Sequence, residues 1–421
     1  MAERKEIAIA LIGPSGAGKT SLVYRVVQNF PKTKLIISYT TRKPRLRPDG
    51  TMEQDGVDYF FVSKTKFKKL KSQGFFFESS DHHDASYGTP KDQCTFSTHN
   101  IIFDVDPNGA RELKKQIPDL IQIFIHPEST LSLSRRLYKR GGLTDDKIKS
   151  RIKRYEDFER LYASECDYQF TNYDGKFKQF FAKVAMTIFK EQGGFMLSLD
   201  SLSGAGGSTL VSNLINHYKG GRHIDSGSFY RVLAWLLGIG RNISPKDPYL
   251  ETILKENHAT FDIDAFNIKS KVFKSPKVDA IVPLWSQNAQ IREEVFWLLM
   301  KSAYHNDEVF IVCEGRDMTS EVFSEAQLLV YLSCSAHIRA KRRHKDSGYK
   351  HLPFNEVLEA INKRDLADRT RKESPFNADV NPRVMEISNE RDPELVLQET
   401  VKYIEIARKS LNGRRSTVLQ D

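Results

Sequence analysis

Two stretches of this chain combine glycines with hydroxyl side chains, as phosphate-binding loops do. The first is GPSGAGKTS, which comprises Gly13, Pro14, Ser15, Gly16, Ala17, Gly18, Lys19, Thr20 and Ser21. It matches G-x-x-x-x-G-K-[ST] at every defined position. Glycines let backbone N–H groups approach phosphate oxygens, Lys19 can reach the terminal phosphates, and Thr20 can ligate Mg²⁺. The first stretch therefore predicts a site for ATP with Mg²⁺.

The second stretch, SLSGAGGSTL, aligns with the first without a gap but lacks the lysine. Its loop comprises Ser203, Gly204, Ala205, Gly206, Gly207, Ser208 and Thr209. Gly207 stands where the first loop has Lys19, and Ser201 stands where it has Gly13. Backbone N–H groups can still form an anion-binding nest. Without the positioned cation, the loop should lose several kcal/mol of transition-state stabilisation.

Residues downstream of the first loop suit a nucleoside monophosphate. Two arginines three apart can form forked hydrogen bonds to its phosphate, and tyrosine hydroxyls can donate to the same group. A carboxylate can accept from the adjacent N–H donors of guanine, which adenine lacks. The predicted residues are Ser38, Arg42, Arg45, Tyr59, Glu78, Tyr87 and Thr89, with Ser38 and Thr89 completing the base pocket.

Two acids and three arginines extend this predicted site. Asp104 and Asp106 follow the apolar run IIFDVD, and the carboxyl end of a strand faces the ligand crevice in an α/β sheet. Arg136, Arg140 and Arg151 lie in SRRLYKRGGLTDDKIKSRI. Concentrated positive charge is what an anionic phosphoryl-transfer transition state requires.

Together the motifs of the first half resemble guanylate kinase over roughly residues 5 to 190. They are S-x-T-T-R-x-P-R, G-x-D-Y-x-F-V-S, F-x-E before Y-G-T, and D-x-D-x-x-G. The resemblance implies that Lys19 and the lid arginines act on the transferred phosphoryl, that Asp104 and Asp106 hold Mg²⁺-bound water or contact GMP, and that Asn172 lines the adenine side. This sequence departs from the family pattern at Asn108, where glutamine is usual. It also departs in RPDGTMEQDG, which we interpret as a flexible insertion.

The motifs of the second half resemble cytidylate kinase over about residues 195 to 410. They are D-S-G-x-x-Y-R, G-R-D-M, R-A-x-R-R and R-D-x-x-D-R-x-R. The resemblance implies that CMP or dCMP contacts Ser226, Arg231, Arg292, Arg316, Asp317, Arg364, Asp368 and Arg371. Three interpretations of this half stay open: a CMP-binding regulatory module, a working kinase with a substitute cation, and a structural appendage.

The elements that position these residues follow from the apolar pattern. EIAIALIG and FMLSLDS each read as a buried strand that leads into a glycine loop and then an amphipathic helix. Further short apolar runs alternate with helical stretches, which predicts mostly parallel sheets covered by helices. We therefore expect an α/β fold of two P-loop nucleoside monophosphate kinase domains with lid and monophosphate-binding insertions, over residues 1–192 and 193–421.

Composition narrows the class of protein. The chain has 421 residues, a net charge of +10 and four cysteines without a C-x-x-C pair. Scattered cysteines, no signal peptide and no long apolar run predict a soluble cytoplasmic protein. The basic charge suits small polyanions better than nucleic acid or a membrane.

A protein-interaction module derived from guanylate kinase is the competing interpretation, but such modules lose Lys19 or the acceptor arginines. The pattern does not specify an oligomeric state.

Overall fold

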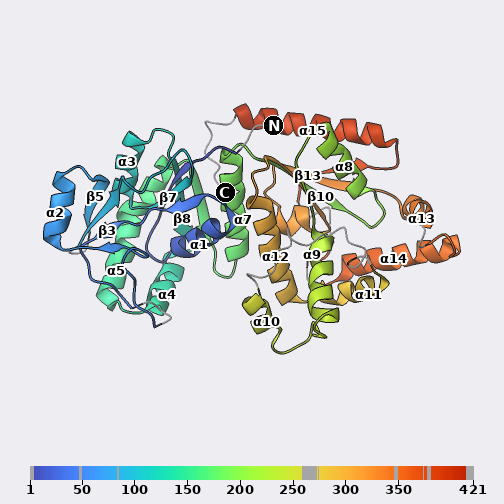
Figure 1. Ribbon diagram of the computed structural model, residues 1–421, viewed down its shortest axis with the longest axis horizontal. Helices are drawn as coiled ribbons and strands as arrows, with labels where there is room; N and C mark the ends of the chain where they lie inside the picture. The colour runs from blue at the N-terminus through green and yellow to red at the C-terminus, as the bar shows by residue number, and fades with distance from the viewer. Residues whose placement is uncertain are drawn as a thin grey trace. The chain divides into compact units, whose positions relative to one another are not determined.

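The computed structural model describes residues 4–46, 50–82, 85–257, 273, 275–345, 349–372, 374–376 and 381–413. The chain folds into two compact units. Of the described residues, the first unit holds 5–192, and the second holds 193–413 together with Arg4. Each unit contains a five-stranded sheet accompanied by helices (Figure 1). The predicted α/β fold class is confirmed, and both of these sheets are wholly parallel.

The main sheet of the first unit has the strand order β2-β7-β1-β8-β9. Its strands are β1 (Ala8–Ile12), β2 (Thr33–Leu35), β7 (Asn100–Asp104), β8 (Ile121–Pro127) and β9 (Tyr168–Asn172). The central strand β1 is AIALI and is buried along its whole length. Such continuous burial is expected of a parallel strand covered on both faces, and it explains the unbroken apolar run.

Several helices of the first unit begin directly after a serine or aspartate whose side chain caps the first turn. The helices of this unit are α1 (Lys19–Asn29), α2 (Lys64–Ser72), α3 (Pro107–Gln116), α4 (Thr130–Arg140), α5 (Asp145–Arg154), α6 (Arg160–Tyr162) and α7 (Phe177–Glu191). The side chains of Ser63, Asp106 and Ser129 accept hydrogen bonds from the first turns of α2, α3 and α4. The helices α4 and α5 contact each other (Figure 1).

A second sheet of the first unit carries the predicted monophosphate residues. Its order is β4-β3-β6-β5, with β3 (Tyr39–Thr40), β4 (Phe60–Phe61), β5 (Phe76–His82) and β6 (Ala85–Pro90). The strands β5 and β6 are antiparallel and place Glu78 opposite Thr89. This pairing brings two of the predicted base-pocket side chains together, because directly opposite residues in an antiparallel pair share a face.

The second unit repeats the parallel arrangement in the order β11-β12-β10-β13-β14. Its strands are β10 (Phe195–Ser201), β11 (Arg222–Asp225), β12 (Phe310–Gly315), β13 (Leu328–Ser333) and β14 (Val384–Ser388). Its helices are α8 (Gly207–His217), α9 (Ser226–Leu233), α10 (Leu250–Asn257), α11 (Pro276–Trp285), α12 (Ala289–Tyr304), α13 (Ala336–His344), α14 (Phe354–Thr370) and α15 (Pro393–Gly413). In both units the first strand leads through a glycine loop into a helix.

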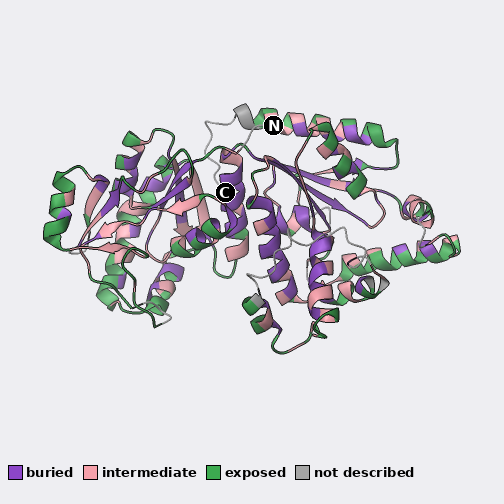
Figure 2. Ribbon diagram, viewed as in Figure 1, coloured by how far each residue is buried: buried purple, intermediate pink, exposed green. Residues whose placement is uncertain are grey.

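The sheets form the centres of the two cores. Ile101 and Phe124 are fully buried in the first unit, as are Leu197, Val312 and Val330 in the second. Figure 2 shows the central strands β10 and β12 of the second unit as buried, while the helices α14 and α15 carry exposed residues. Within the part of the chain that the structure describes, no helix is long and apolar enough to cross a membrane.

Candidate active site

The first glycine loop is folded as an anion-binding nest. Gly16 and Gly18 have φ values of 95° and 100°, a left-handed conformation that side chains disfavour. The loop closes with a hydrogen bond from the Ala17 amide to the Pro14 carbonyl. Gly18 caps α1 without a side-chain hydrogen bond, so the first backbone N–H groups of the helix are available to an anionic ligand.

Lys19 is held at the mouth of this loop. Its Nζ donates to the carbonyl of Gly13 at 2.5 Å and of Pro14 at 3.3 Å, and lies 3.7 Å from Oδ1 of Asp104. Asp104 ends β7, in register with Leu11 of β1. The sheet thus brings a carboxylate to the loop from a distant part of the sequence. An ammonium in this position can neutralise terminal phosphates.

A hydroxyl and a carboxylate at this loop suit Mg²⁺. Thr20 follows Lys19 in α1, and the Asp104 side chain, which lies 3.7 Å from the Lys19 ammonium, is 38% exposed. Mg²⁺ keeps several waters and takes one or two carboxylates together with substrate phosphates, so this donor set fits the ion. Among the described residues, no group of three or more His, Cys, Asp or Glu side chains can hold a metal.

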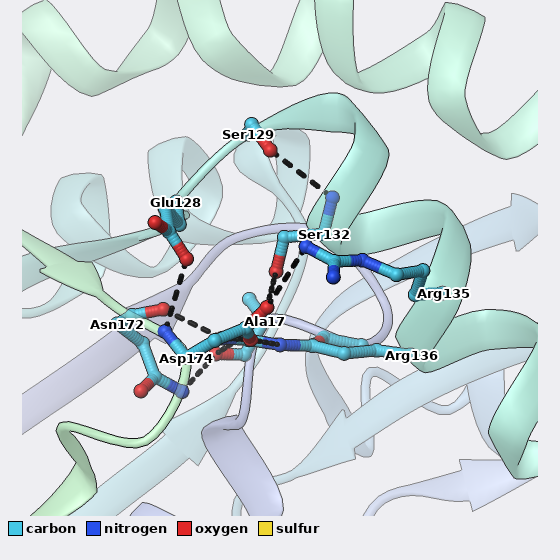
Figure 3. Close-up of polar contacts among 9 residues, drawn as sticks. Ala17, Glu128, Ser129, Ser132, Arg135, Arg136, Asn172 and Asp174 are labelled. Carbon is cyan, nitrogen blue, oxygen red and sulfur yellow. Dashed lines mark hydrogen bonds and ion pairs between the residues drawn. The ribbon is translucent and has the colours of Figure 1, made fainter.

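Arg136 clamps the loop to its neighbours. Its guanidinium donates to the carbonyls of Gly16 and Ala17, both at 3.5 Å, and to that of Asn172 at 2.7 Å. The side-chain amide of Asn172 donates to the Ala17 carbonyl at 2.8 Å. Figure 3 shows these groups converging on Ala17. The structure therefore brings the predicted Arg136 and Asn172 together at one point of the loop.

Asp174 orients that arginine. Its Oδ1 accepts from Arg136 at 2.9 and 2.7 Å, and its Oδ2 accepts from Ser132 and Arg135 (Figure 3). The hydrogen bond from Arg136, followed by the one from Ser132, lowers the pKa of the Asp174 carboxyl. The sequence patterns did not point to Asp174. Its position two residues after Asn172 is the only local signal that could have indicated it.

The two remaining lid arginines point to the same hydroxyl. Arg140 and Arg151 donate to Oγ of Ser15 at 3.3 and 3.0 Å. Burial, and then the positive charges of Arg45 and Arg140, lower the pKa of the Arg151 guanidinium. A guanidinium whose pKa is lowered in this way would gain from an anion, so these arginines form a cationic group beside the phosphate loop.

The predicted base pocket contains a buried carboxylate. Glu78 is 8% exposed, and Thr89 Oγ1 donates to its Oε1 at 2.6 Å. A Cβ added to Gly109 would lie 3.1 Å from Glu78 Cδ, so the first turn of α3 passes directly beside the carboxylate. Asp106 caps α3 by accepting from the Gly109 amide at 2.9 Å and also pairs with Arg154. The carboxylate of Asp106 is therefore engaged within the protein.

The predicted phosphate residues meet around Arg42. Its guanidinium lies 4.7 Å from the ring centroid of Tyr59, and the rings of Tyr59 and Tyr87 are 6.0 Å apart. Burial raises the pKa of Tyr59 to about 12, with a further rise from the Asp104 charge. The Ser38 carbonyl accepts from the Phe60 amide, which joins this residue to β4.

Glu53 is a member of this site that sequence reasoning missed. It lies in the segment predicted to be a flexible insertion, of which residues 47–49 lie outside the described residues. Its carboxylate accepts from Arg42 at 2.5 and 2.8 Å and from the Arg45 amide at 2.8 Å. The insertion therefore contributes a carboxylate that pairs with the Arg42 guanidinium and accepts from the backbone amide of Arg45.

The second glycine loop has the same backbone form as the first. Gly204 and Gly206 have φ values of 80° and 93°. The Asn389 side chain donates to the Ala205 carbonyl at 2.5 Å, and Arg342 donates to the carbonyls of Ala205 and Asn389 at 3.3 and 2.7 Å. Arg342 and Asn389 thus repeat the roles of Arg136 and Asn172. Arg342 stands in one of the sequence motifs, but the motifs predicted neither residue for the site.

The predicted CMP residues fall into two connected groups. In the first, Asp317 pairs with Arg292 and lies 4.0 Å from Arg371. In the second, Arg316 pairs with Asp368 at 3.2 Å. A Cβ added to Gly315 would lie 2.4 Å from Ser226 Oγ, so Ser226 packs against the residue that precedes Arg316.

Arg364 lies in a cationic environment. Burial, followed by the charge of Arg316, lowers its pKa, while Asp368 raises it and Arg231 and Arg343 lower it further. A buried arginine with like-charged neighbours is what a phosphate-binding site requires before its anion arrives. All eight predicted residues of this set therefore lie in the two groups or beside them.

Comparison with known proteins finds a matching family model for each unit. Residues 5–191 match the Guanylate kinase family model, and residues 197–405 match the Cytidylate kinase family model. The guanylate kinase of Rickettsia felis is 35% identical over 193 residues, which are 45% of this chain and 96% of that protein. The chain belongs to the guanylate kinase family. Its second unit is similar to cytidylate kinase.

Two further relatives concern the guanylate kinase unit. The guanylate kinase of Maricaulis maris is 39% identical over 175 residues, which are 41% of this chain and 78% of that protein. A crystal structure of guanylate kinase from Anaplasma phagocytophilum matches 46% of this chain and 89% of that chain, with 23% identity and a TM-score of 0.36. The family resemblance noted from the motifs is confirmed for both halves by the two family models.

Proposed function

We propose that the guanylate kinase unit transfers the γ-phosphoryl group of ATP to GMP or dGMP. One observation carries this proposal: a complete phosphate loop with Lys19 and a buried Glu78–Thr89 pair occur in the same compact unit. The loop supplies amides for the donor phosphates, and the pair supplies acceptors for a base with adjacent N–H donors. The presence of Lys19, Arg42 and Arg45 argues against a pure interaction module.

In this proposal the chain positions both substrates and neutralises charge. Arg42 and Arg45 grip the GMP phosphate, and the Tyr59 hydroxyl donates to it, since its raised pKa keeps the proton in place. Lys19, Arg136, Arg140 and Arg151 surround the group in transfer, where negative charge is spread over its oxygens. Thr20 and Asp104 would hold Mg²⁺, which would add positive charge to neutralise the phosphates of ATP. No general base is required, because positioning and charge dominate this reaction.

For the second unit we propose a site for CMP or dCMP. The cationic surroundings of Arg364 and the Arg292–Asp317–Arg371 group support it. We also propose a cytoplasmic location for the protein, which its four free thiols suit.

The test is a coupled assay of ADP release with ATP, Mg²⁺ and either GMP or CMP, on wild type and Lys19→Ala. We expect GMP turnover in the wild type and a loss of about 10²–10³-fold in the variant, since one positioned charge contributes about 3–4 kcal/mol. Absence of GMP turnover in the folded wild type would overturn the proposal.

A further inference from the structure

The two phosphate loops can be compared residue by residue within this chain. A Cβ added to Gly18 would lie 2.3 Å from Asn172 Nδ2, and one added to Gly206 would lie 2.4 Å from Asn389 Nδ2. Both glycines are left-handed N-caps, of α1 and of α8. Because the loops agree in backbone form and in their clamping asparagine, differences in side chains at equivalent positions are meaningful.

Strand register identifies the counterpart of Asp104. In the first unit Leu11 of β1 is paired with Asp104 of β7. The gap-free alignment of the loops places Leu199 at the position of Leu11, and Leu199 of β10 is paired with Glu314 of β12. Glu314 therefore occupies the position of Asp104, with a side chain longer by one methylene group.

That longer side chain fills the space beside Gly207. A Cβ added to Gly207 would lie 2.2 Å from Glu314 Oε1 and 2.7 Å from Ser201 Oγ. The carboxylate is fixed there, since its Oε2 accepts from Ser208 Oγ at 2.9 Å and lies 3.0 Å from His223 Nε2. Where the first loop has an ammonium facing the shorter Asp104, the second has a glutamate carboxylate and no lysine.

Neighbouring arginines are engaged in other contacts. Arg342 donates to the carbonyls of Ala205 and Asn389, as Arg136 donates to those of Ala17 and Asn172 in the first unit. Arg342 is therefore the counterpart of Arg136 and does not replace Lys19. Arg339 is buried and pairs with Asp365 in two hydrogen bonds. The replacement of Lys19 by Gly207 and of Asp104 by Glu314 therefore leaves the mouth of the second loop more negative by one charge.

We propose that Glu314 excludes the terminal phosphates of a nucleoside triphosphate from the second loop. The second unit then binds a nucleoside monophosphate without phosphorylating it. Only the statement that the second unit binds a nucleoside monophosphate rests on the proposed CMP site. The inference also makes Gly207 and Glu314 a coupled pair: a lysine at 207 requires residue 314 to be shortened to the aspartate that the first unit carries and the Ser201 hydroxyl to turn aside.

The test counts triphosphate sites per chain by isothermal titration with Mg²⁺ and the non-hydrolysable analogue AMPPNP. The variants are Gly207→Lys, Glu314→Asp and the double variant, with Glu359→Gln on the exposed face of α14 as the matched control. We expect one site per chain in the wild type, the control and both single variants, and two in the double variant. CMP-dependent ADP release should rise at least tenfold in the double variant alone.

The outcomes separate this inference from the proposed function. Two triphosphate sites in the wild type, or CMP turnover that survives Lys19→Ala, would overturn the role of Glu314. A single triphosphate site in the double variant would also overturn it, provided that the double variant is folded. Its folding is shown if its GMP turnover and melting temperature match those of Glu359→Gln. If CMP binds to none of the proteins, the cytidylate proposal fails, while the AMPPNP stoichiometry still decides the role of Glu314.

Discussion

Replacement of Glu78 by glutamine tests how this enzyme selects guanine. The carboxylate is buried, accepts from Thr89 at 2.6 Å and lies beside the first turn of α3. We infer that it also accepts two N–H donors of guanine. Hydrogen bonds to a buried charged group contribute about 1.5–3 kcal/mol each, and a buried unsatisfied donor costs about 1–3 kcal/mol.

Glutamine keeps one acceptor but turns an NH₂ group toward a guanine donor. We therefore expect Glu78→Gln to lose about 3 kcal/mol of transition-state binding, which is roughly 150-fold in kcat/KM. The assay is ADP release with GMP, repeated with IMP, which lacks the exocyclic amine. The preference of the wild type for GMP over IMP should shrink in the variant, because its amide no longer distinguishes the two bases.

The matched control is Glu112→Gln, since Glu112 lies on α3 with its side chain 53% exposed. It should retain wild-type kinetics with both substrates. If Glu78→Gln keeps kcat/KM for GMP within about threefold of the wild type, Glu78 does not contact the base, and the assignment of this pocket is refuted.

Three further predictions concern other parts of the chain. Tyr59→Phe should raise KM for GMP about fivefold, since one hydrogen bond contributes about 1 kcal/mol. Because the pKa of Tyr59 is near 12, KM should depend on pH from 8 to 10 in the same way in the wild type and in the variant, and a difference between the two profiles would contradict this role. Asp174→Asn should lower kcat about tenfold with KM for GMP unchanged, because Arg136 loses its orienting charge. A rise of about tenfold in KM for GMP would argue against that role. Burial raises the pKa of Asp200 from 3.8 to about 6, so its contribution to folding is present below pH 3.8 and lost as the pH rises through 6. Relative to Asp200→Asn, the wild type should lose about 2.5 kcal/mol of unfolding free energy between pH 4 and pH 7 in urea titrations, and a constant difference would contradict this sign.

Local patterns in the sequence were sufficient to predict the fold and to select most residues of the candidate site. A buried strand, left-handed glycines and a helix occur in consecutive residues, so the loop around Lys19 could be predicted from spacing alone. The relation of Glu78 to Thr89 likewise follows from adjacent strands. The specific contacts of the predicted residues with nucleotides stay predictions.

Residues brought in by long-range register could not be predicted in this way. Glu53 lies in an insertion whose polar composition resembles a loop, and only the fold turns its carboxylate onto Arg42. Glu314 lies within the buried strand β12, directly before the motif G-R-D-M, whose arginine and aspartate drew attention. Its importance depends on which residue of β10 it faces, and a linear pattern does not specify the register between strands far apart in the sequence.

The clamp made by Arg136 determines which part of this kinase is free to move. Since Arg136 joins α4 to the glycine loop and to Asn172, these elements form one rigid block. Gly141 and Gly142 follow α4 with φ values of 72° and 71°, and they provide a natural hinge. A swing of α5 about these glycines would carry Arg151 away from Ser15, and it would also break the ion pair between Arg154 and Asp106. The enzyme would then expose its donor site by withdrawing a single arginine, while the rest of the cationic cluster stays assembled between turnovers.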